Sequence, residues 1–208
     1  MRAVLMTGPG EPEVLTPAEV AEPALTGPTQ VKVALAAAGV NPVDTKIRRR
    51  GLLAGDTYPA ILGCDGAGEV VEAGEQVSHL KPGDRVWFCN GGLGADPGNY
   101  AEFAVVEGNV ARPMPRSLDY TTAAAAPLVL ITAWGALYDR ARLQAGQTVL
   151  VHAGAGGVGH VAVQLARLAG ARVITTVGDH AKGAFTAELG AERAVFHRQE
   201  DFVEAVAD

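Results

Sequence analysis

The sequence predicts an α/β protein in which a β-rich N-terminal domain is followed by the first half of a doubly wound parallel sheet. Three observations predict this class. Short β-rich runs separated by Gly and Pro extend to about Arg116, a glycine motif follows an apolar strand near residue 150, and strands and helices then alternate. The predicted domains are residues 1–118 and 119–208.

In the first domain, the apolar runs indicate a small all-β or partly open barrel. The expected strands are residues 3–6, 31–38, 68–72, 85–88 and 100–106. Residues 81–84, Lys-Pro-Gly-Asp, have the pattern of a type II turn, because Pro takes the second place and Gly the third. Residues 90–99 contain four glycines and predict a loop.

Two helices are expected between the domains' β segments. Asp119 is suited to cap a helix over residues 120–126, which Pro127 ends or kinks. A second helical run covers residues 128–142 and delivers the chain to a strand at residues 149–152. The four mostly apolar residues of that strand are typical of a buried parallel sheet.

The glycine motif lies directly after this strand and opens a helix. Gly154, Gly156 and Gly159 occupy the G-x-G-x-x-G positions, which allow a tight turn, a close approach to a pyrophosphate and close packing of helix on strand. A glycine triplet alone also fits an ordinary loop, but a second strand at residues 171–177 gives the βαβ spacing of a dinucleotide site. The residues expected to contact a cofactor here are Gly154, Gly156, Gly157, Val158 and Gly159.

The remaining elements continue the alternation. The pattern predicts a helix over residues 181–189, which Gly190 ends, a short strand near residues 194–196 and a last helix from about Asp201. This order implies a parallel sheet with right-handed crossovers.

Composition limits the classes of partner. The net charge of -6 and the absence of basic clusters beyond residues 48–50 argue against nucleic acid as the main partner. Those three arginines are interpreted as a solvated turn before Gly51. No apolar run reaches the ~20 residues of a membrane span, and the first one is too short for a signal peptide. Two cysteines, Cys64 and Cys89, cannot form a disulfide framework, so a cytoplasmic location is expected.

Three longer motifs add a family resemblance. Residues 146–159 read G-Q-x-x-L-x-x-x-G-A-G-G-x-G and are followed by Gln164 and Arg167, residues 40–44 read V-N-P-V-D, and residues 130–134 read L-I-T-A-W. With these motifs the whole chain resembles the zinc-free quinone oxidoreductase (zeta-crystallin-like) branch of the medium-chain dehydrogenase/reductase superfamily. The resemblance implies a GroES-like first domain, a Rossmann second domain, and hydride transfer from NADPH to a quinone or to the alkene of an α,β-unsaturated carbonyl compound.

The resemblance also bears on zinc, because related alcohol dehydrogenases use that metal. Asn41 stands where those relatives carry a ligand cysteine, and Gly63-Cys64-Asp65 stands where they carry Gly-His-Glu. A tetrahedral zinc site needs three or four Cys, His or carboxylate ligands. Cys64 has no such partner set in the sequence and is interpreted as a small buried thiol, so no metal is expected.

By the same resemblance, Asn41 and Thr132 are expected beside the nicotinamide. A turn residue before Pro42 is the alternative role for Asn41. Tyr58 is a candidate donor to a substrate carbonyl, although a Tyr before Pro is commonly a packing residue. The branch usually has Tyr where this chain has Lys46, which puts aromatic stacking on a quinone in doubt and favours a more polar substrate.

NADPH is the expected cofactor. An acidic residue at the end of the second strand, roughly 20 residues after the motif, would bind the ribose 2′-hydroxyl of NADH. The resemblance places Val177 there, and Lys182 matches a lysine that some relatives direct at the 2′-phosphate. Asp179 in the same turn would repel a phosphate if it pointed inward, and His197, or Arg198 beside it, would offset that repulsion.

Two other functions remain open: a non-catalytic, crystallin-like protein that binds NADPH, and a zinc-type alcohol dehydrogenase, which the missing ligands disfavour. The sequence does not name the acceptor. Because only three strands of the doubly wound sheet are present, we expect the 208 residues to belong to a longer reductase or to need a partner that completes the sheet. A homodimer is expected for the full-length protein.

Overall fold

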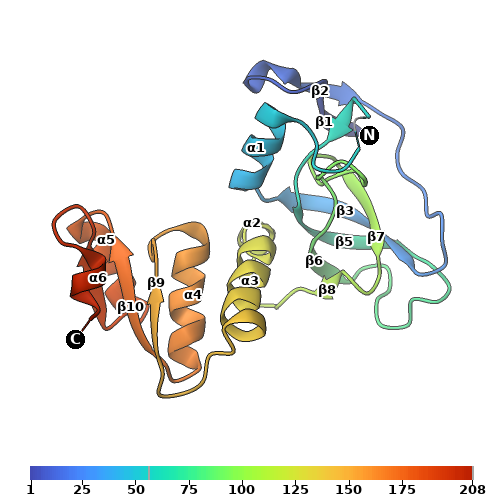
Figure 1. Ribbon diagram of the computed structural model, residues 1–208. Coiled ribbons are helices and arrows are strands. Elements are labelled where there is room, and N and C mark those ends of the chain that lie inside the picture. The colour runs from blue at the N-terminus through green and yellow to red at the C-terminus, as the bar shows by residue number, and fades with distance from the viewer. Residues whose placement is uncertain (56, 208) are drawn as a thin grey trace. The chain divides into compact units, whose positions relative to one another are not determined.

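The computed structural model describes residues 1–55 and 57–207, and these form two compact units. The first unit comprises Met1–Leu128, and the second begins at Val129. Figure 1 shows the first unit as the β-rich one and the second as the one with strands and helices in alternation. The division falls after α2 (Tyr120–Ala124), so this helix, which the sequence analysis placed in the second domain, is counted with the first unit.

The core of the first unit lies on a five-stranded antiparallel sheet with the order β7-β3-β5-β6-β8. Its strands are β3 (Gln30–Ala38), β5 (Asp65–Ala73), β6 (Arg85–Cys89), β7 (Phe103–Glu107) and β8 (Arg112–Pro113). Alternate residues of β3 and β6, such as Val31, Val33, Val86 and Phe88, are buried in one cluster. Gly83 has a φ of 92° in the turn before β6, and Asp84 donates to Lys81 O, as the predicted type II turn requires.

A second, smaller sheet in this unit has the order β2-β1-β4. It contains β1 (Arg2–Met6), β2 (Leu15–Glu19) and β4 (Ala60–Ile61), and a 3-10 turn at Pro12–Val14 precedes β2. The sequence analysis did not predict β2, whose Pro17 is confined to such edge strands because it has no N–H to donate.

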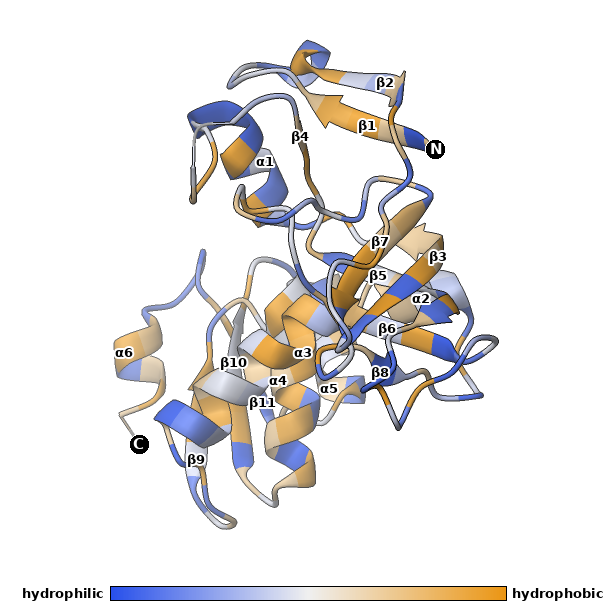
Figure 2. Ribbon diagram, turned by 90° about the vertical axis from the view of Figure 1, so that its right-hand side faces the viewer, coloured by the Kyte–Doolittle hydropathy of each residue, from blue (hydrophilic) through white to orange (hydrophobic). Residues whose placement is uncertain are grey.

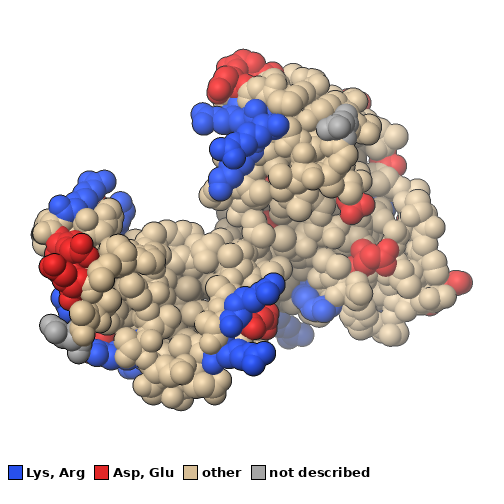
Figure 3. Space-filling view, in the orientation of Figure 1, with Lys and Arg blue, Asp and Glu red and all other residues tan. Residues whose placement is uncertain are grey.

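Helix α1 (Pro42–Arg50) corrects the interpretation of residues 48–50 as a solvated turn. Pro42 takes the first helical position, where its missing N–H costs nothing, and the helix ends at Gly51 with a φ of 104°. Lys and Arg side chains gather over this helix (Figure 3), yet Arg48 is buried. Its guanidinium donates to Gly10 O and lies 3.7 Å from the Glu11 carboxylate. Arg48 therefore ties the N-terminal loop to α1.

Two helices, α2 and α3 (Pro127–Trp134), follow β8 along the chain. Asp119 accepts from Thr122 N at 2.7 Å, so the predicted cap of α2 is confirmed. The predicted helix over residues 128–142 is α3 followed by a π-helical segment, Gly135–Arg140. Figure 2 shows α3 as predominantly hydrophobic. No helix in the described ranges is long and apolar enough to cross a bilayer.

The second unit is a parallel sheet with the order β11-β10-β9. Its elements are β9 (Thr148–Val151), α4 (Gly157–Leu168), β10 (Arg172–Val177), α5 (His180–Glu188), β11 (Arg193–Phe196) and α6 (Phe202–Ala205). The register pairs Val173 with Val149 and Thr176 with Val195, which confirms the predicted βαβ order. The central strand β10 is almost fully buried, whereas β9 is only half-buried because one of its edges carries no neighbour among the described strands.

Candidate functional site

The predicted glycine turn joins β9 to α4, and two of its glycines are required by close contacts. A Cβ at Gly154 would lie 1.9 Å from Thr175 Oγ1, and a Cβ at Gly159 would lie 2.1 Å from Ala153 O. The third glycine therefore lets the helix pack close to the strand, as predicted. The left-handed residue of the turn is Ala153, with a φ of 53°, rather than Gly154.

Two threonines of β10 hold this turn in place, and the sequence analysis missed both. Thr175 Oγ1 donates to Val151 O at 2.6 Å. Thr176 Oγ1 accepts from Ala153 N at 3.0 Å, and Thr176 O accepts from Gly154 N at 3.1 Å. Both threonines are buried. Only the strand pairing brings them to the turn, although polar residues within an otherwise apolar strand are a signal that sequence reasoning can use.

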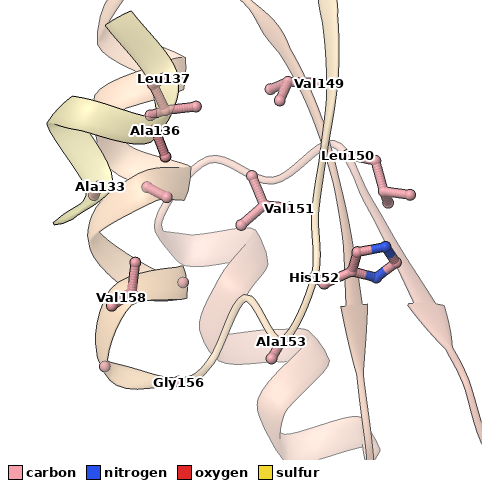
Figure 4. A pocket seen from close by; sticks show the side chains of 13 residues that line it. Ala133, Ala136, Leu137, Val149, Leu150, Val151, His152, Ala153, Gly156 and Val158 are labelled. Atoms are coloured by element: carbon pink, nitrogen blue, oxygen red, sulfur yellow. The ribbon is translucent and has the colours of Figure 1, made fainter. Parts of the chain in front are cut away.

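The first turn of α4 leaves backbone donors available for an anion. Gly156 is the N-cap and has no side chain to satisfy the N–H groups of Gly157, Val158 and Gly159. A pocket of about 390 Å³ adjoins this turn, and its walls come from β9, the start of α4 and residues 133–137 (Figure 4). Such a helix N-terminus with bare glycine backbone suits a phosphate group.

The end of β10 carries a cluster of cations around one carboxylate. Val177 is buried and offers no acceptor for a ribose hydroxyl. Asp179 caps α5, accepting from Lys182 N at 2.9 Å, and its carboxylate lies 3.2 Å from Lys182 Nζ. These contacts, with the charges of Lys182 and Arg198, lower the pKa of Asp179.

His197 and Arg198 flank the residue between Val177 and Asp179. A Cβ at Gly178 would lie 3.7 Å from His197 Nε2 and 3.9 Å from Arg198 Cζ. The cationic side chains of Lys182 and Arg198 are thus gathered at the carboxyl end of β10, where a doubly wound sheet binds its ligand.

In the first unit, Asn41 is the N-cap of α1 and is held by two buried carboxylates. Its backbone N–H donates to Asp44 Oδ2 at 2.7 Å, and its Nδ2 donates to Asp65 Oδ2 at 2.8 Å. Asp44 Oδ2 also accepts from the Tyr100 hydroxyl at 2.9 Å. Asn41 is therefore more than a residue that turns the chain before Pro42.

The other two predicted catalytic residues, Tyr58 and Thr132, belong to different units of the chain. Tyr58 packs against the cluster of Met6, Ile47 and Leu62, and its hydroxyl accepts from Leu52 N at 3.3 Å. No hydrogen bond joins it to Asn41 in the part of the chain that the structure describes. Thr132 is an exposed residue of α3 in the second unit.

The buried carboxylates shift the pKa values of their neighbours. Burial raises the pKa of Asp65, against hydrogen bonds from Asn41, Cys89 and Leu128 that lower it. Burial, with the charges of Asp44 and Asp65, raises the pKa of Cys64 to about 11. For Cys89, burial and Asp65 raise it to about 12. Both thiols therefore stay protonated at neutral pH.

These residues do not fit a zinc site. The metal binds cysteine as the thiolate, and the raised pKa of Cys64 opposes that form. The Asn41 amide is directed at Asp65 through its nitrogen, which is no ligand. Among the described residues, no three His, Cys, Asp or Glu side chains converge as a metal site would require.

An antiparallel β unit followed by a strand, glycine turn and helix in a parallel sheet defines a protein with a Rossmann-type dinucleotide-binding domain. Comparison with known families agrees. The family described as "Alcohol dehydrogenase GroES-like domain" matches residues 27–116, and the one described as "Zinc-binding dehydrogenase" matches residues 157–208. The chain belongs to the medium-chain dehydrogenase/reductase superfamily, and the predicted fold class is confirmed.

Comparison with individual proteins shows similarity to quinone oxidoreductases. The chain is 37% identical over 207 residues to the quinone oxidoreductase of Rattus norvegicus, covering 99% of this chain and 61% of that protein. It superposes on the structure of Escherichia coli quinone oxidoreductase complexed with NADPH with a TM-score of 0.85 and 33% identity, over 99% of this chain and 61% of that one.

An alcohol dehydrogenase superfamily protein from Novosphingobium aromaticivorans gives a TM-score of 0.90 and 39% identity, over 99% and 62% of the two chains. The chain thus spans about three fifths of the length of these relatives.

Proposed function

We propose that this chain provides the cofactor-binding turn and the Asn41 site of an NADPH-dependent, zinc-independent reductase whose acceptor is a quinone or the alkene of an α,β-unsaturated carbonyl compound. The observation that carries the proposal is the glycine turn, in which bare backbone and the N-terminus of α4 face the surface. The names of the relatives support the quinone, and the donor set around Asn41 supports an activity without zinc.

NADPH is favoured over NADH by the chemistry at the end of β10. Val177 cannot accept from a ribose hydroxyl, and Asp179 is turned to cap α5 and pair with Lys182. Lys182 and Arg198 supply positive charge for a 2′-phosphate, and His197 adds a further donor beside Gly178. When bound, the cofactor supplies the hydride. The protein's part is to bind the phosphates and to orient the ring, for which Asn41 and Thr132 are the proposed neighbours.

Paired dissociation constants for NADPH and NADH test the cofactor assignment. Arg198→Ala and Lys182→Ala should each weaken the binding free energy of NADPH by about 1.5–3 kcal/mol, the strength of a charge-assisted hydrogen bond. The dissociation constant of NADH should not change. Arg172→Ala is the matched control, because it removes a cation from the start of β10, whereas Lys182 and Arg198 lie near the end of that strand. Equal losses for both cofactors would contradict the assignment.

A screen of NADPH oxidation tests the reaction. The candidate acceptors are quinones, 2-alkenals and saturated aldehydes, assayed with and without a chelator. Reduction of quinones or 2-alkenals that survives chelation supports the proposal. Tight NADPH binding without turnover on any acceptor would instead favour a non-catalytic binding protein.

A further inference from the structure

Asp65 forms a hydrogen bond with the side chain of Asn41. Asn41 follows the end of β3, and Asp65 is the first residue of β5. The carboxylate is fully buried at the first residue of β5. Its Oδ2 accepts from Asn41 Nδ2 at 2.8 Å, and its Oδ1 accepts from Leu128 N at 2.9 Å. Gly39 N donates to Asp65 O at 3.1 Å, so the chain just before Asn41 is also fastened to this residue.

The chemistry of a carboxylate decides which way the Asn41 amide faces. An ionised carboxylate only accepts hydrogen bonds, and the donors around Asp65, which are Asn41 Nδ2, Leu128 N and the Cys89 thiol, suit that form. The nitrogen of the Asn41 amide must therefore face Asp65. Rotation of the amide would place two acceptor oxygens against each other.

The cost of burying this carboxylate argues against a purely stabilising role. Among the residues that the structure describes, no side-chain nitrogen of a Lys, Arg or His lies within 4.0 Å of a carboxylate oxygen of Asp65 or Asp44. Buried carboxylates without a cation are expensive, and a neutral side chain would fill the space at lower cost. The alternative, that Asp65 merely anchors the start of α3 through Leu128, has to be separated by experiment.

We propose that Asp65 is a positioning residue for Asn41, because its buried carboxylate fixes the orientation of the Asn41 side-chain amide. The inference rests on the proposed function, in which that amide lies beside the nicotinamide. Asp65 acts through Asn41 and touches no reactant. Asp44 completes the arrangement, since it holds the backbone N–H of the same asparagine.

The experiment uses Asp65→Asn, which keeps the shape but allows either atom of the new amide to face Asn41. We expect kcat for NADPH-dependent quinone reduction to fall about tenfold or more, which corresponds to the loss of one hydrogen bond to a charged group. The dissociation constant of NADPH should change little, because the glycine turn is untouched. Cys89→Ala is the matched control, since it removes another donor to Asp65 without touching Asn41.

A double-mutant comparison separates positioning from general stability. In an Asn41→Ala background, Asp65→Asn should lower kcat no further, because the residue through which it acts is gone. The same fall in kcat in both backgrounds, or an equal fall caused by Cys89→Ala, would overturn the proposal.

A measurement without turnover keeps the inference distinct from the proposed function. The Asn41 side-chain amide signal, assigned by its loss in Asn41→Ala, should shift in the ¹H–¹⁵N NMR spectrum of Asp65→Asn and stay in place in Cys89→Ala. An unshifted signal in Asp65→Asn would overturn the inference. If the wild-type protein binds NADPH but reduces no acceptor, the proposed function fails, and the NMR result alone decides the inference.

Discussion

The glycine turn of the second unit and the Asn41 cluster of the first unit are built in opposite ways. At the turn, the important feature is the lack of side chains, because a Cβ at Gly154 or Gly159 would lie about 2 Å from its neighbour. Around Asn41, the important feature is a set of buried polar side chains: Asp44 and Asp65 bond Asn41 itself, and Asn99 bonds the carbonyl oxygen of Cys64, the residue before Asp65.

The difference explains how each site responds to change. Gly159 packs against the backbone of Ala153 and Gly154 against the hydrogen-bonded side chain of Thr175, so an added methyl group at either position must displace a strand or helix. The polar cluster can lose one member and keep its shape, but it then leaves a buried group without a partner. We therefore expect the largest losses of stability from added side-chain atoms at the turn, and smaller losses from the removal of polar side chains in the cluster.

Gly159→Ala should have the largest effect. Its Cβ would lie 2.1 Å from Ala153 O, and relieving that contact should cost about 3 kcal/mol of the free energy of unfolding. Gly157→Ala is the matched control in the same turn, since its Cβ would meet only Val129 Cγ1 at 3.6 Å; its effect should stay below about 1 kcal/mol. Denaturant unfolding measures both, and similar values for the two variants would show that the turn is not sterically constrained.

Asn99→Ala should cause the second largest loss in the free energy of unfolding. Its Nδ2 lies within hydrogen-bond distance of the carbonyl oxygens of Gly63, Cys64 and Asn90, at 3.1, 2.9 and 3.0 Å. Gly63 O and Cys64 O still accept from Asn99 N and Asn90 N after the change, so the cost, about 2 kcal/mol, comes from the lost side-chain hydrogen bonds. Asn109→Ala removes an exposed asparagine of the same unit and should change stability by less than about 0.5 kcal/mol. If the two alanine variants unfold at the same denaturant concentration, the network around Asn99 contributes nothing.

The smallest predicted effect is a loss of stability in mild alkali. Cys64 and Cys89 have pKa values raised from 9.0 to about 11 and about 12, and the pKa of Tyr100 is raised by burial and by Asp44. The unfolded chain releases these protons first, so their full contribution is present below pH 9 and is lost as the pH rises toward the folded-state values. Unfolding curves at pH 8 and 9.5 should differ by about 1 kcal/mol, and Cys89→Ala should reduce the difference. Stability that rises over this range would contradict the assigned shifts.

Local patterns predicted much of the fold. The strands at Arg2–Met6 and Arg172–Val177 and the helix at Gly157–Leu168 lie where apolar periodicity and glycine placement put them. The missed strand Leu15–Glu19 and helix Pro42–Arg50 contain or begin with proline, which weakens a local signal. The expected nicotinamide contacts of Asn41 and Thr132, and the expected donation from Tyr58 to a substrate carbonyl, remain predictions.

The sequence by itself determined the strand, turn and helix of the dinucleotide site, because each of those features depends on residues adjacent in the chain. Only the tertiary structure showed that Thr175 and Thr176 form hydrogen bonds with the turn. It also showed that the buried Arg48 side chain donates to Gly10 O, and that Asp65 accepts from Asn41, 24 positions away in the sequence. The physical reason is that hydrogen bonds between distant residues depend on strand pairing and on the packing of helices and loops, which fix neighbours that no local pattern encodes.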